Sequence, residues 1–389
     1  MSPSELRASL SLASIFGLRL FGMFIILPVF ALYALERPGW SLTLVGVALG
    51  AYGITQAILQ LPFGWISDRR GRKPVMYFGL TLFAIGSFVC ASSDLPLVVI
   101  AGRILQGAGA ISAVAIATAA DLTRDSQRTK AMAIIGSTIG VVFAVSFIAA
   151  PFLQSAVGVR GIFAMTGGLA VAALLVVRFI VPDAPMREHA RKVSLAAVFR
   201  DRELVRLNIG IFVLHAVLMA MFVVVPIGLV KAGMPAGRHW WIYLGAVGAG
   251  FVLMLPGVVG PWAHRERRVF VAAIAAVAVA LALLTFALDS LAGIVTALVI
   301  FFTGFNVLEA KLPALVSRAA PREAVGSATG IYSSVQFLGT FVGGAAGGAI
   351  AQHAGFTAVL AGCLVLTLAW LAAAWGMGDY RAVARSPRD

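Results

Sequence analysis

The stretch that decides the fold is Gly64-Trp65-Ile66-Ser67-Asp68-Arg69-Arg70-Gly71-Arg72-Lys73-Pro74. Four cations and one carboxylate fall between Asp68 and Lys73, in a chain of which only 12% of the residues are charged. The apolar runs on both sides of this segment are each long enough to cross a bilayer. The contrast predicts a tight polar loop, exposed to water, between two membrane-spanning helices.

The composition of the whole chain also indicates a membrane protein. Its 389 residues are 60% hydrophobic with a mean hydropathy of +0.97, whereas soluble domains contain about 45–50% apolar residues. The net charge of +14 would suit nucleic acid in a soluble protein, but so apolar a chain argues against that class. Cys90 and Cys363 lie inside apolar runs without metal-binding spacing, so we expect no metal and no cofactor.

Apolar runs of about 20 residues recur along the entire chain, and each is long enough for one transmembrane helix. Backbone polar groups at lipid depth must be satisfied within a segment, so these runs are expected to be helices. The sequence predicts twelve spans, at roughly 9–35, 42–66, 74–93, 97–121, 130–153, 158–181, 205–230, 239–263, 269–287, 291–316, 325–350 and 355–377.

Positive charge is distributed unevenly between the two sets of loops. Most of the 30 Lys and Arg residues fall on the side that holds both termini. The loops of the other side hold only Arg37, Arg160, Lys231 and Arg238. Because cytoplasmic loops carry the excess of cations, we expect both termini in the cytoplasm and the protein in the cell inner membrane.

The two halves of the chain repeat each other. Pro28 in the first span has its counterpart in Pro226 of the seventh, and Gly64 at the end of the second span matches Gly260 at the end of the eighth. Two repeated halves are typical of alternating-access transporters. We therefore predict an N-terminal six-helix bundle over 1–181, a cytoplasmic linker over 182–204, a C-terminal six-helix bundle over 205–378 and a cytoplasmic tail over 379–389.

Several motifs together resemble the major facilitator superfamily. Gly64-x-x-x-Asp68-Arg69-x-Gly71-Arg72-Lys73 is similar to its motif A, and Arg103-Ile-Leu-Gln106-Gly107-Ala-Gly109-Ala110 to motif B of its proton-coupled members. Four further strings resemble the YajR-type drug/proton antiporters. They are the string around Arg19, the string from Tyr52 to Gly64, Asn306-x-x-Glu309 and Tyr332-Ser-Ser-x-Gln336. The resemblance covers nearly the whole chain and implies an all-α fold of twelve transmembrane helices in two pseudo-symmetric bundles.

The charges of motif A suggest a conformational latch. The carboxylate of Asp68 is able to pair with Arg72 and to face the positive end of a neighbouring helix, and Asp121 at the end of the fourth span is expected to join the cluster. The resemblance implies the same role. The alternative is a basic loop that only fixes the topology. The predicted latch residues are Gly64, Asp68, Arg69, Gly71, Arg72, Lys73 and Asp121.

The ionisable residues within the spans are candidates for proton coupling, because charges at this depth are costly and are functional by default. The resemblance implies that Arg103 faces the cavity and shifts the pKa of a nearby acid. Alternatively, its side chain snorkels to the outer surface of the membrane. Glu309 is the only carboxylate well inside a span, and with His215 it forms the predicted proton-carrying pair. The alternative for Glu309 is a static ion pair with Arg19 or Lys311.

Polar residues that share a helical face are candidates for lining a substrate cavity. They are equally compatible with hydrogen bonds that join helices. Arg19 falls about ten residues into its span, near mid-bilayer by the helical rise of about 1.5 Å per residue. The predicted cavity residues are Arg19, Gln56, Gln60, Asn306, Tyr332 and Gln336.

These features lead to the prediction of a secondary transporter that moves a small solute across the lipid bilayer, most simply a monomer that expels the solute in exchange for protons. Arg19 stands where many drug/proton antiporters carry an acid, and span 5 has Gly136-x-x-x-Gly140 with a distant Pro151. Uptake or facilitated transport of an anionic metabolite therefore stays open, as does a transport-inactive sensor or scaffold. No HExxH, GxSxG or nucleotide-binding motif occurs, so we predict neither an enzyme nor an ATP-driven pump.

Overall fold

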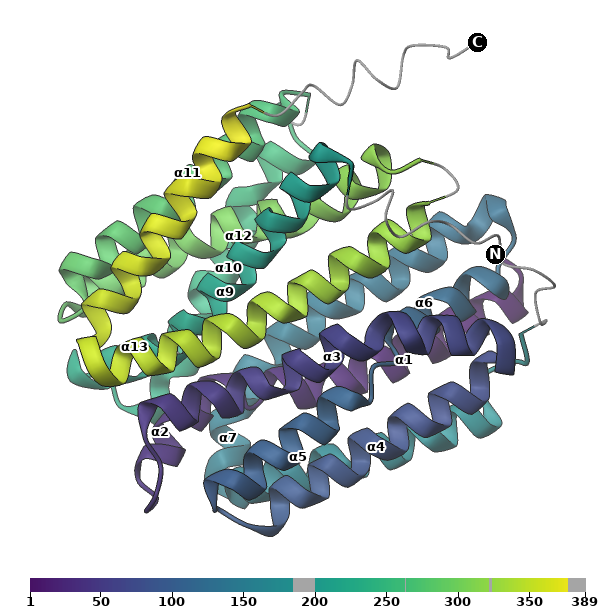
Figure 1. The fold of residues 1–389 in the computed structure, drawn as a ribbon, viewed down its shortest axis with the longest axis horizontal. Helices are drawn as coiled ribbons and strands as arrows, with labels where there is room; N and C mark the ends of the chain where they lie inside the picture. Colours follow the sequence, from purple (N-terminus) through teal and green to yellow (C-terminus); the bar gives the residue numbers. More distant parts are fainter. Residues whose placement is uncertain (185–199, 263, 322–323, 377–389) are drawn as a thin grey trace. The chain divides into compact units, whose positions relative to one another are not determined.

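The computed structural model describes residues 1–184, 200–262, 264–321 and 324–376, and in these ranges it contains helices and no strands (Figure 1). The helices are α1 (Pro3–Phe24), α2 (Leu27–Leu35), α3 (Leu42–Arg70), α4 (Arg72–Ser92), α5 (Pro96–Ala108), α6 (Ser112–Asp121), α7 (Asp125–Phe179), α9 (Arg202–Lys231), the short 3-10 helix η1 (Ala236–Arg238), α10 (His239–Val258), α11 (Glu266–Ala287), α12 (Leu291–Ala319) and α13 (Val325–Trp375).

Ten helical segments among the described residues are long and apolar enough to cross a membrane, and two of them are long enough to cross it twice. Helices α7 and α13 have 55 and 51 residues, about 80 Å at 1.5 Å per residue, whereas a bilayer core is about 30 Å thick. Each turns at a glycine with positive φ, 68° at Gly158 and 84° at Gly355, which a side chain would strain. The ten segments thus make the twelve crossings predicted.

Two predicted spans are broken rather than continuous. In the first, α1 ends at Phe24 and α2 begins at Leu27, because the ring of Pro28 clashes with the carbonyl four residues earlier. In the fourth, Gly109–Ile111 separates α5 from α6. A Cβ added at Gly109 would lie 2.5 Å from the carbonyl oxygen of Gly79 in α4, so the chain leaves the helix at a close approach to α4.

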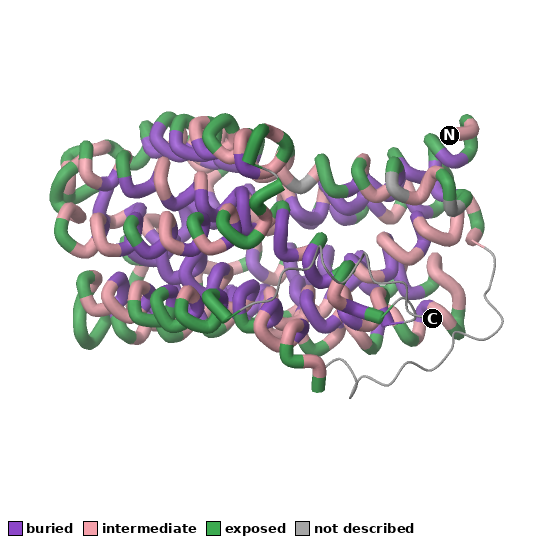
Figure 2. The backbone as a smooth tube through the Cα atoms, turned by 90° about the horizontal axis from the view of Figure 1, so that it is seen from above, coloured by how far each residue is buried: buried purple, intermediate pink, exposed green. Residues whose placement is uncertain are grey.

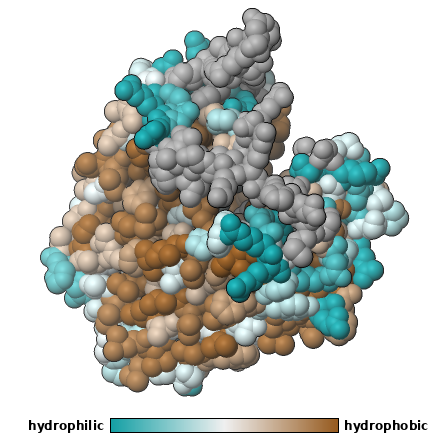
Figure 3. Space-filling view, turned by 45° about the vertical axis from the view of Figure 1, so that its right-hand side comes forward, coloured by the Kyte–Doolittle hydropathy of each residue, from teal (hydrophilic) through white to brown (hydrophobic). Residues whose placement is uncertain are grey.

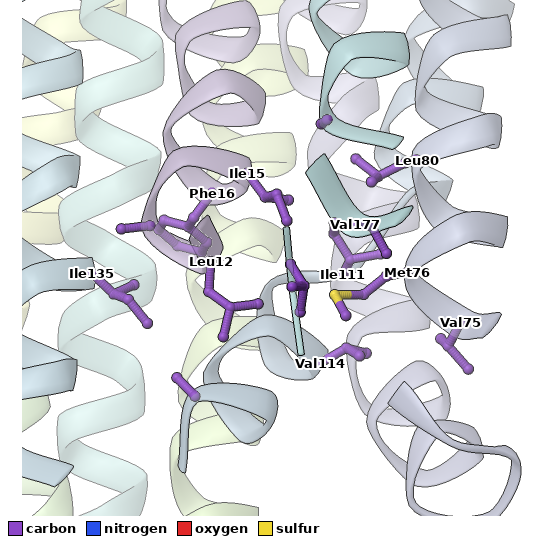
Figure 4. Close-up of a cluster of buried hydrophobic side chains, with 14 of the residues drawn as sticks. Leu12, Ile15, Phe16, Val75, Met76, Leu80, Ile111, Val114, Ile135 and Val177 are labelled. Atoms are coloured by element: carbon purple, nitrogen blue, oxygen red, sulfur yellow. The ribbon is translucent and has the colours of Figure 1, made fainter. Parts of the chain in front are cut away.

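The chain divides into two compact units, Met1–Arg191 and Lys192–Asp389. In the first unit, α1 and α4 pack on α7, and α5 packs on α3 and α4. A core of buried apolar side chains, including Leu12, Met76 and Ile111, joins α1, α4 and the α5–α6 connection (Figure 4). Arg7 near the start of α1 donates to the carbonyl oxygen of Phe179 at the end of α7, at 3.2 Å.

In the second unit, α9 packs along the first part of α13, and α11 and α12 pack side by side. The α9–α13 contact is close because glycines line it. A Cβ at Gly343 would lie 2.0 Å from the carbonyl oxygen of Ala216. Arg206 near the start of α9 donates to the carbonyl oxygen of Gly376 just after α13, at 3.0 Å. Arg206 and Arg7 thus make equivalent bonds in the two units.

Large apolar side chains are exposed on the outside of the helices, as a lipid environment requires. Phe286 is 89% exposed, Leu97 78% and Val259 76%. Buried and exposed residues alternate along the helices (Figure 2), and hydrophobic residues cover much of the face seen in Figure 3. The protein is therefore a multi-pass membrane protein. Most of the predicted linker at 182–204 and all but the start of the C-terminal segment after Trp375 lie outside the described residues.

Candidate functional site

The segment Gly64–Pro74 is helical on both sides of a single residue. Helix α3 continues to Arg70 and α4 begins at Arg72, with Gly71 (φ 89°) between them. The prediction of a polar loop over the whole segment is therefore wrong. Arg69 and Arg70 lie in the last turn of α3, where positive side chains interact favourably with the helix dipole, so the charges prolong this helix instead of ending it.

Arg72 is the centre of the charged cluster at this corner. Its guanidinium lies 2.9 Å from Asp121 Oδ2 at the end of α6, donates to Ser67 Oγ at 2.6 Å and pairs with Asp68 one turn earlier. The side chains of Arg72 and Asp121 are only 9% and 3% exposed. One buried cation thus connects α3, α4 and α6, as expected for Asp68, Arg72 and Asp121.

The other predicted latch residues make their contacts outside this cluster. Lys73 pairs with Asp183, just after α7, at 2.7 Å, and its ammonium holds the pKa of the Asp183 carboxyl below its usual range. That pair is present at neutral pH and is lost as the pH falls through the lowered value. Arg69 stacks over the ring of Trp65, with 3.5 Å between the guanidinium carbon and the ring centroid. At Gly64 an added Cβ would make only ordinary van der Waals contact.

Arg103 is buried between α3 and α5 and is 3% exposed, so the snorkelling alternative is wrong. Its guanidinium donates to the carbonyl oxygens of Ala48 and Leu49, at 3.3 and 3.4 Å, and to Gln106 Oε1 at 2.9 Å. Gln106 in turn donates to Ser87 Oγ of α4 at 2.8 Å. These bonds to neutral oxygens join α3, α4 and α5.

Arg19 is the centre of a second buried polar network in the first unit. It is 2% exposed and donates to Ser112 Oγ, to the Tyr52 hydroxyl and to Gln56 Oε1. Gln56 donates to Gln60 Oε1 at 2.7 Å. Three of the predicted cavity residues, Arg19, Gln56 and Gln60, therefore lie together, bonded to one another in a network that joins α1, α3 and α6.

His215 and Glu309 lie together in the second unit. His215 Nε2 is 3.5 Å from Glu309 Oε1, with side-chain exposures of 12% and 31%. The same nitrogen lies 2.8 Å from Gln336 Nε2, and His215 Nδ1 lies 3.3 Å from the carbonyl oxygen of Ile211. The predicted proton-carrying pair is thus close in space, with Gln336 as a direct neighbour. Helices α9, α12 and α13 each supply one of the three side chains.

Polar atoms without hydrogen-bond partners gather around this pair. Within the part of the chain that the structure describes, Asn306 Nδ2, Glu309 Oε1 and the Tyr332 hydroxyl are buried and make no hydrogen bond. Asn306 and Tyr332 are 8% and 4% exposed. Buried polar groups are normally hydrogen-bonded, so three such atoms on two neighbouring helices mark a candidate ligand or proton site.

Several residues of these clusters were missed in the sequence. Glu5 is 5% exposed and pairs with Arg124 at 2.9 Å, joining α1 to the residue before α7. The pattern Ser2-x-x-Glu5 is a capping box, and this signal was available, but nothing in it indicates Arg124 as the partner. Tyr52 begins one of the strings that carry the resemblance, but nothing in that string indicates Arg19 as its partner, and Asp183 carried no signal, since an acid in a linker is common.

Comparisons with known proteins agree on one family. The model of the Major Facilitator Superfamily matches residues 12–344 and 267–388. The inner membrane transport protein YajR of Escherichia coli K12 is 39% identical over 97% of this chain and 85% of its own length. The multidrug resistance protein MdtH of Yersinia enterocolitica is 28% identical over 64% of this chain and 62% of its own. The crystal structure of a mutant of the nucleoside transporter NupG superposes with a TM-score of 0.76 at 14% identity, over 96% of this chain and all of that one.

Proposed function

The chain belongs to the Major Facilitator Superfamily, and from this premise we propose that it is a proton-coupled exporter, which expels a small solute in exchange for protons. Membership makes it a membrane transporter of a small molecule. Proton coupling and the outward direction are the proposal. In this scheme the chain works by alternating access, with both termini in the cytoplasm and one chain as the working unit in the inner membrane.

The observation that carries the proposal is the pair of His215 and Glu309. Two side chains that each take up and release a proton lie 3.5 Å apart on two membrane-spanning helices, and Glu309 Oε1 makes no hydrogen bond among the described residues. A carboxylate at this depth in a membrane-spanning helix is costly unless it serves a function. The unpaired oxygen supports a role in which Glu309 alternately holds a proton and a substrate cation.

The substrate, in this proposal, also uses the polar atoms beside the pair. Asn306 Nδ2 and the Tyr332 hydroxyl are buried donors without partners in the described parts of the chain. A solute with hydrogen-bond acceptors would satisfy them, and its positive charge would replace the proton on Glu309. Arg103, whose bonds go to neutral oxygens, then serves to hold α3 and α5 together.

The cluster of Arg72, Asp68 and Asp121 supports the conformational part of the scheme. A cation bound by two carboxylates in a nearly buried site forms an interaction that a change in protonation would weaken. We propose that this cluster, with Gly64, Arg69, Gly71 and Lys73 around it, stabilises one of the two states of the transporter. The direction of transport is supported by the similarity to MdtH, which is named for multidrug resistance.

A second candidate function is the uptake or facilitated transport of an anionic metabolite. It is favoured by Arg19 and Arg103, both buried, whose guanidinium groups lie 5.6 and 5.3 Å from the ring centroid of Tyr52. Among the residues that the structure describes, the hydrogen bonds of Arg19 and Arg103 go to neutral groups, and Arg19 Nε makes none. In this alternative a substrate anion supplies the negative charge.

The test is proton flux in proteoliposomes that contain a pH-sensitive dye. The purified protein is challenged with lipophilic cations, sugars and organic anions, and Glu309→Gln is compared with Glu266→Gln. Glu266 is a matched control because it pairs with Arg318 away from the candidate site. We expect a cation-dependent pH change in the wild type and in Glu266→Gln, and its loss in Glu309→Gln. A response to anions alone would favour the second candidate, and full activity of Glu309→Gln would remove Glu309 from the mechanism.

A further inference from the structure

The hydrogen bonds of His215 define which of its nitrogens carries a proton. Nδ1 lies 3.3 Å from the carbonyl oxygen of Ile211, one helical turn earlier in α9. A carbonyl oxygen only accepts, so Nδ1 must be the N–H donor. In the neutral imidazole, Nε2 is then the acceptor, and its lone pair points toward α12 and α13.

Two side chains compete for this one nitrogen. Gln336 Nε2 lies 2.8 Å from His215 Nε2, whereas Glu309 Oε1 lies at 3.5 Å and makes no hydrogen bond in the described residues. The amide N–H of Gln336 therefore donates to the lone pair. A carboxylate has no proton to donate there, which accounts for the longer distance of Glu309.

Close packing of α13 on α9 holds Gln336 in this position. One turn after Gln336, a Cβ at Gly339 would lie 2.4 Å from the carbonyl oxygen of Phe212, and one at Gly343 would lie 2.0 Å from that of Ala216. These two α9 residues flank His215 in the sequence. With the two backbones in contact, Gln336 has little freedom to move away and responds to the imidazole mainly by turning its amide.

We propose that Gln336 is a positioning residue that holds the His215 imidazole in its neutral form with Nε2 as acceptor, and that it yields this nitrogen to Glu309 when a proton arrives. The inference rests on the proposed function, since it specifies the protonation and hydrogen bonding of the pair of His215 and Glu309. When a proton binds Nε2, a new N–H bond forms there, and the amide of Gln336 no longer faces an acceptor. The amide turns, and the Nε2–H donates to the Glu309 carboxylate.

The groups around the imidazole are few. From α12, the carboxylate of Glu309 faces the imidazole, and the ring of Phe305 lies 5.9 Å from it between ring centroids. From α13 come Gln336 and, beside Glu309, Tyr332. Lys311, two residues beyond Glu309, is 7% exposed. Of these, Gln336 is the neutral hydrogen-bonding group in direct contact with Nε2.

The test is ¹⁵N NMR of the histidine side chains in the full-length protein in nanodiscs, with the His215 signals assigned by their loss in His215→Gln. We expect the Nδ1–H tautomer in the wild type. In Gln336→Leu the imidazole should take up its proton about one pH unit higher, because one hydrogen bond to the neutral form is lost. Gln336→Glu, whose carboxylate accepts but does not donate, should shift the titration in the same direction.

Thr340→Val is the matched control. Thr340 lies one turn after Gln336 on α13, and its hydroxyl bonds to the Gln336 carbonyl oxygen rather than to His215. It should titrate like the wild type. An Nε2–H tautomer in the wild type, or unchanged titration in both Gln336 variants, would overturn the inference.

The NMR result is independent of transport. If the proteoliposomes show no proton flux but the titration shifts as expected, the proposed function fails and the role of Gln336 on the imidazole stands. If proton flux is present and the titration of His215 is the same in all variants, the proposed function stands and the inference about Gln336 fails.

Discussion

Arg72 shows how a single side chain determines a corner of the first unit. Its guanidinium reaches three side chains on two other helices, and it is nearly buried together with Asp121. Replacing Asp121 would leave the nearly buried Arg72 with Asp68, whose side chain is 37% exposed, as its remaining carboxylate, and loss of one partner of a buried ion pair is strongly destabilising.

We therefore expect Asp121→Asn to destabilise the protein by about 3 kcal/mol, seen as a lower midpoint of thermal unfolding in detergent. Asp183→Asn is the comparison, because Asp183 pairs with Lys73 but its side chain is 90% exposed, and exposed pairs contribute little. Equal midpoints for the two variants would contradict a stabilising role for the buried pair.

For single residues, the sequence predicted which side chains belong to the site better than it predicted their hydrogen-bond and ion-pair partners. Asp68, Arg72 and Asp121 were expected together, and so were His215 and Glu309, because few charges occur in the apolar runs. The bond of Gln336 to His215 and that of Glu5 to Arg124 connect residues more than a hundred positions apart. No local pattern encodes such distances, which depend on how the helices pack.

Among the elements, α13 and α9 pack closely, and this packing depends on glycine. At Gly343 a single added methyl group would overlap the backbone of Ala216. Overpacking of this kind costs about 1–3 kcal/mol because the backbones must separate.

Gly343→Ala should accordingly lower the thermal unfolding midpoint and weaken proton-coupled transport, since Gln336 and His215 would move apart with their helices. Gly362→Ala, in the second part of the same α13, is the control, because nothing lies within 4 Å of a Cβ there. Thermal unfolding of both variants measures the effect. A loss of stability in Gly362→Ala as large as that in Gly343→Ala would indicate a general sensitivity of α13 to alanine.

For the helices, the sequence predicts the number of membrane crossings but not where each helix ends or breaks. Lengths of apolar runs were enough to predict twelve crossings, because bilayer thickness sets a minimum for each. They did not predict that α3 continues through Asp68 to Arg70, since polarity alone does not distinguish a loop from a polar helix end. The break before Pro28 was predictable in principle, yet the equivalent Pro226 lies inside the continuous α9. Tertiary packing decides between these two outcomes.

For the whole molecule, the distribution of cations predicts the orientation in the membrane. We expect a cysteine at Asp289, between α11 and α12, to react with a membrane-impermeant maleimide added to intact cells. A cysteine at Arg265, just before α11, should react only after the membrane is opened. The background is Cys90→Ala with Cys363→Ala, which removes the two native thiols, both buried. The reverse labelling pattern would place both termini outside.

The bonds of Arg7 to Phe179 and of Arg206 to Gly376 have a consequence for biosynthesis. Each connects the beginning of a unit's first helix to the end of its last helix. The first unit therefore contains its closing contacts once Asp183 has left the ribosome, before α9 has emerged from it. We expect it to reach its native packing while the second half is still being made, so that the nascent chain exposes at most one incomplete bundle to the membrane at a time.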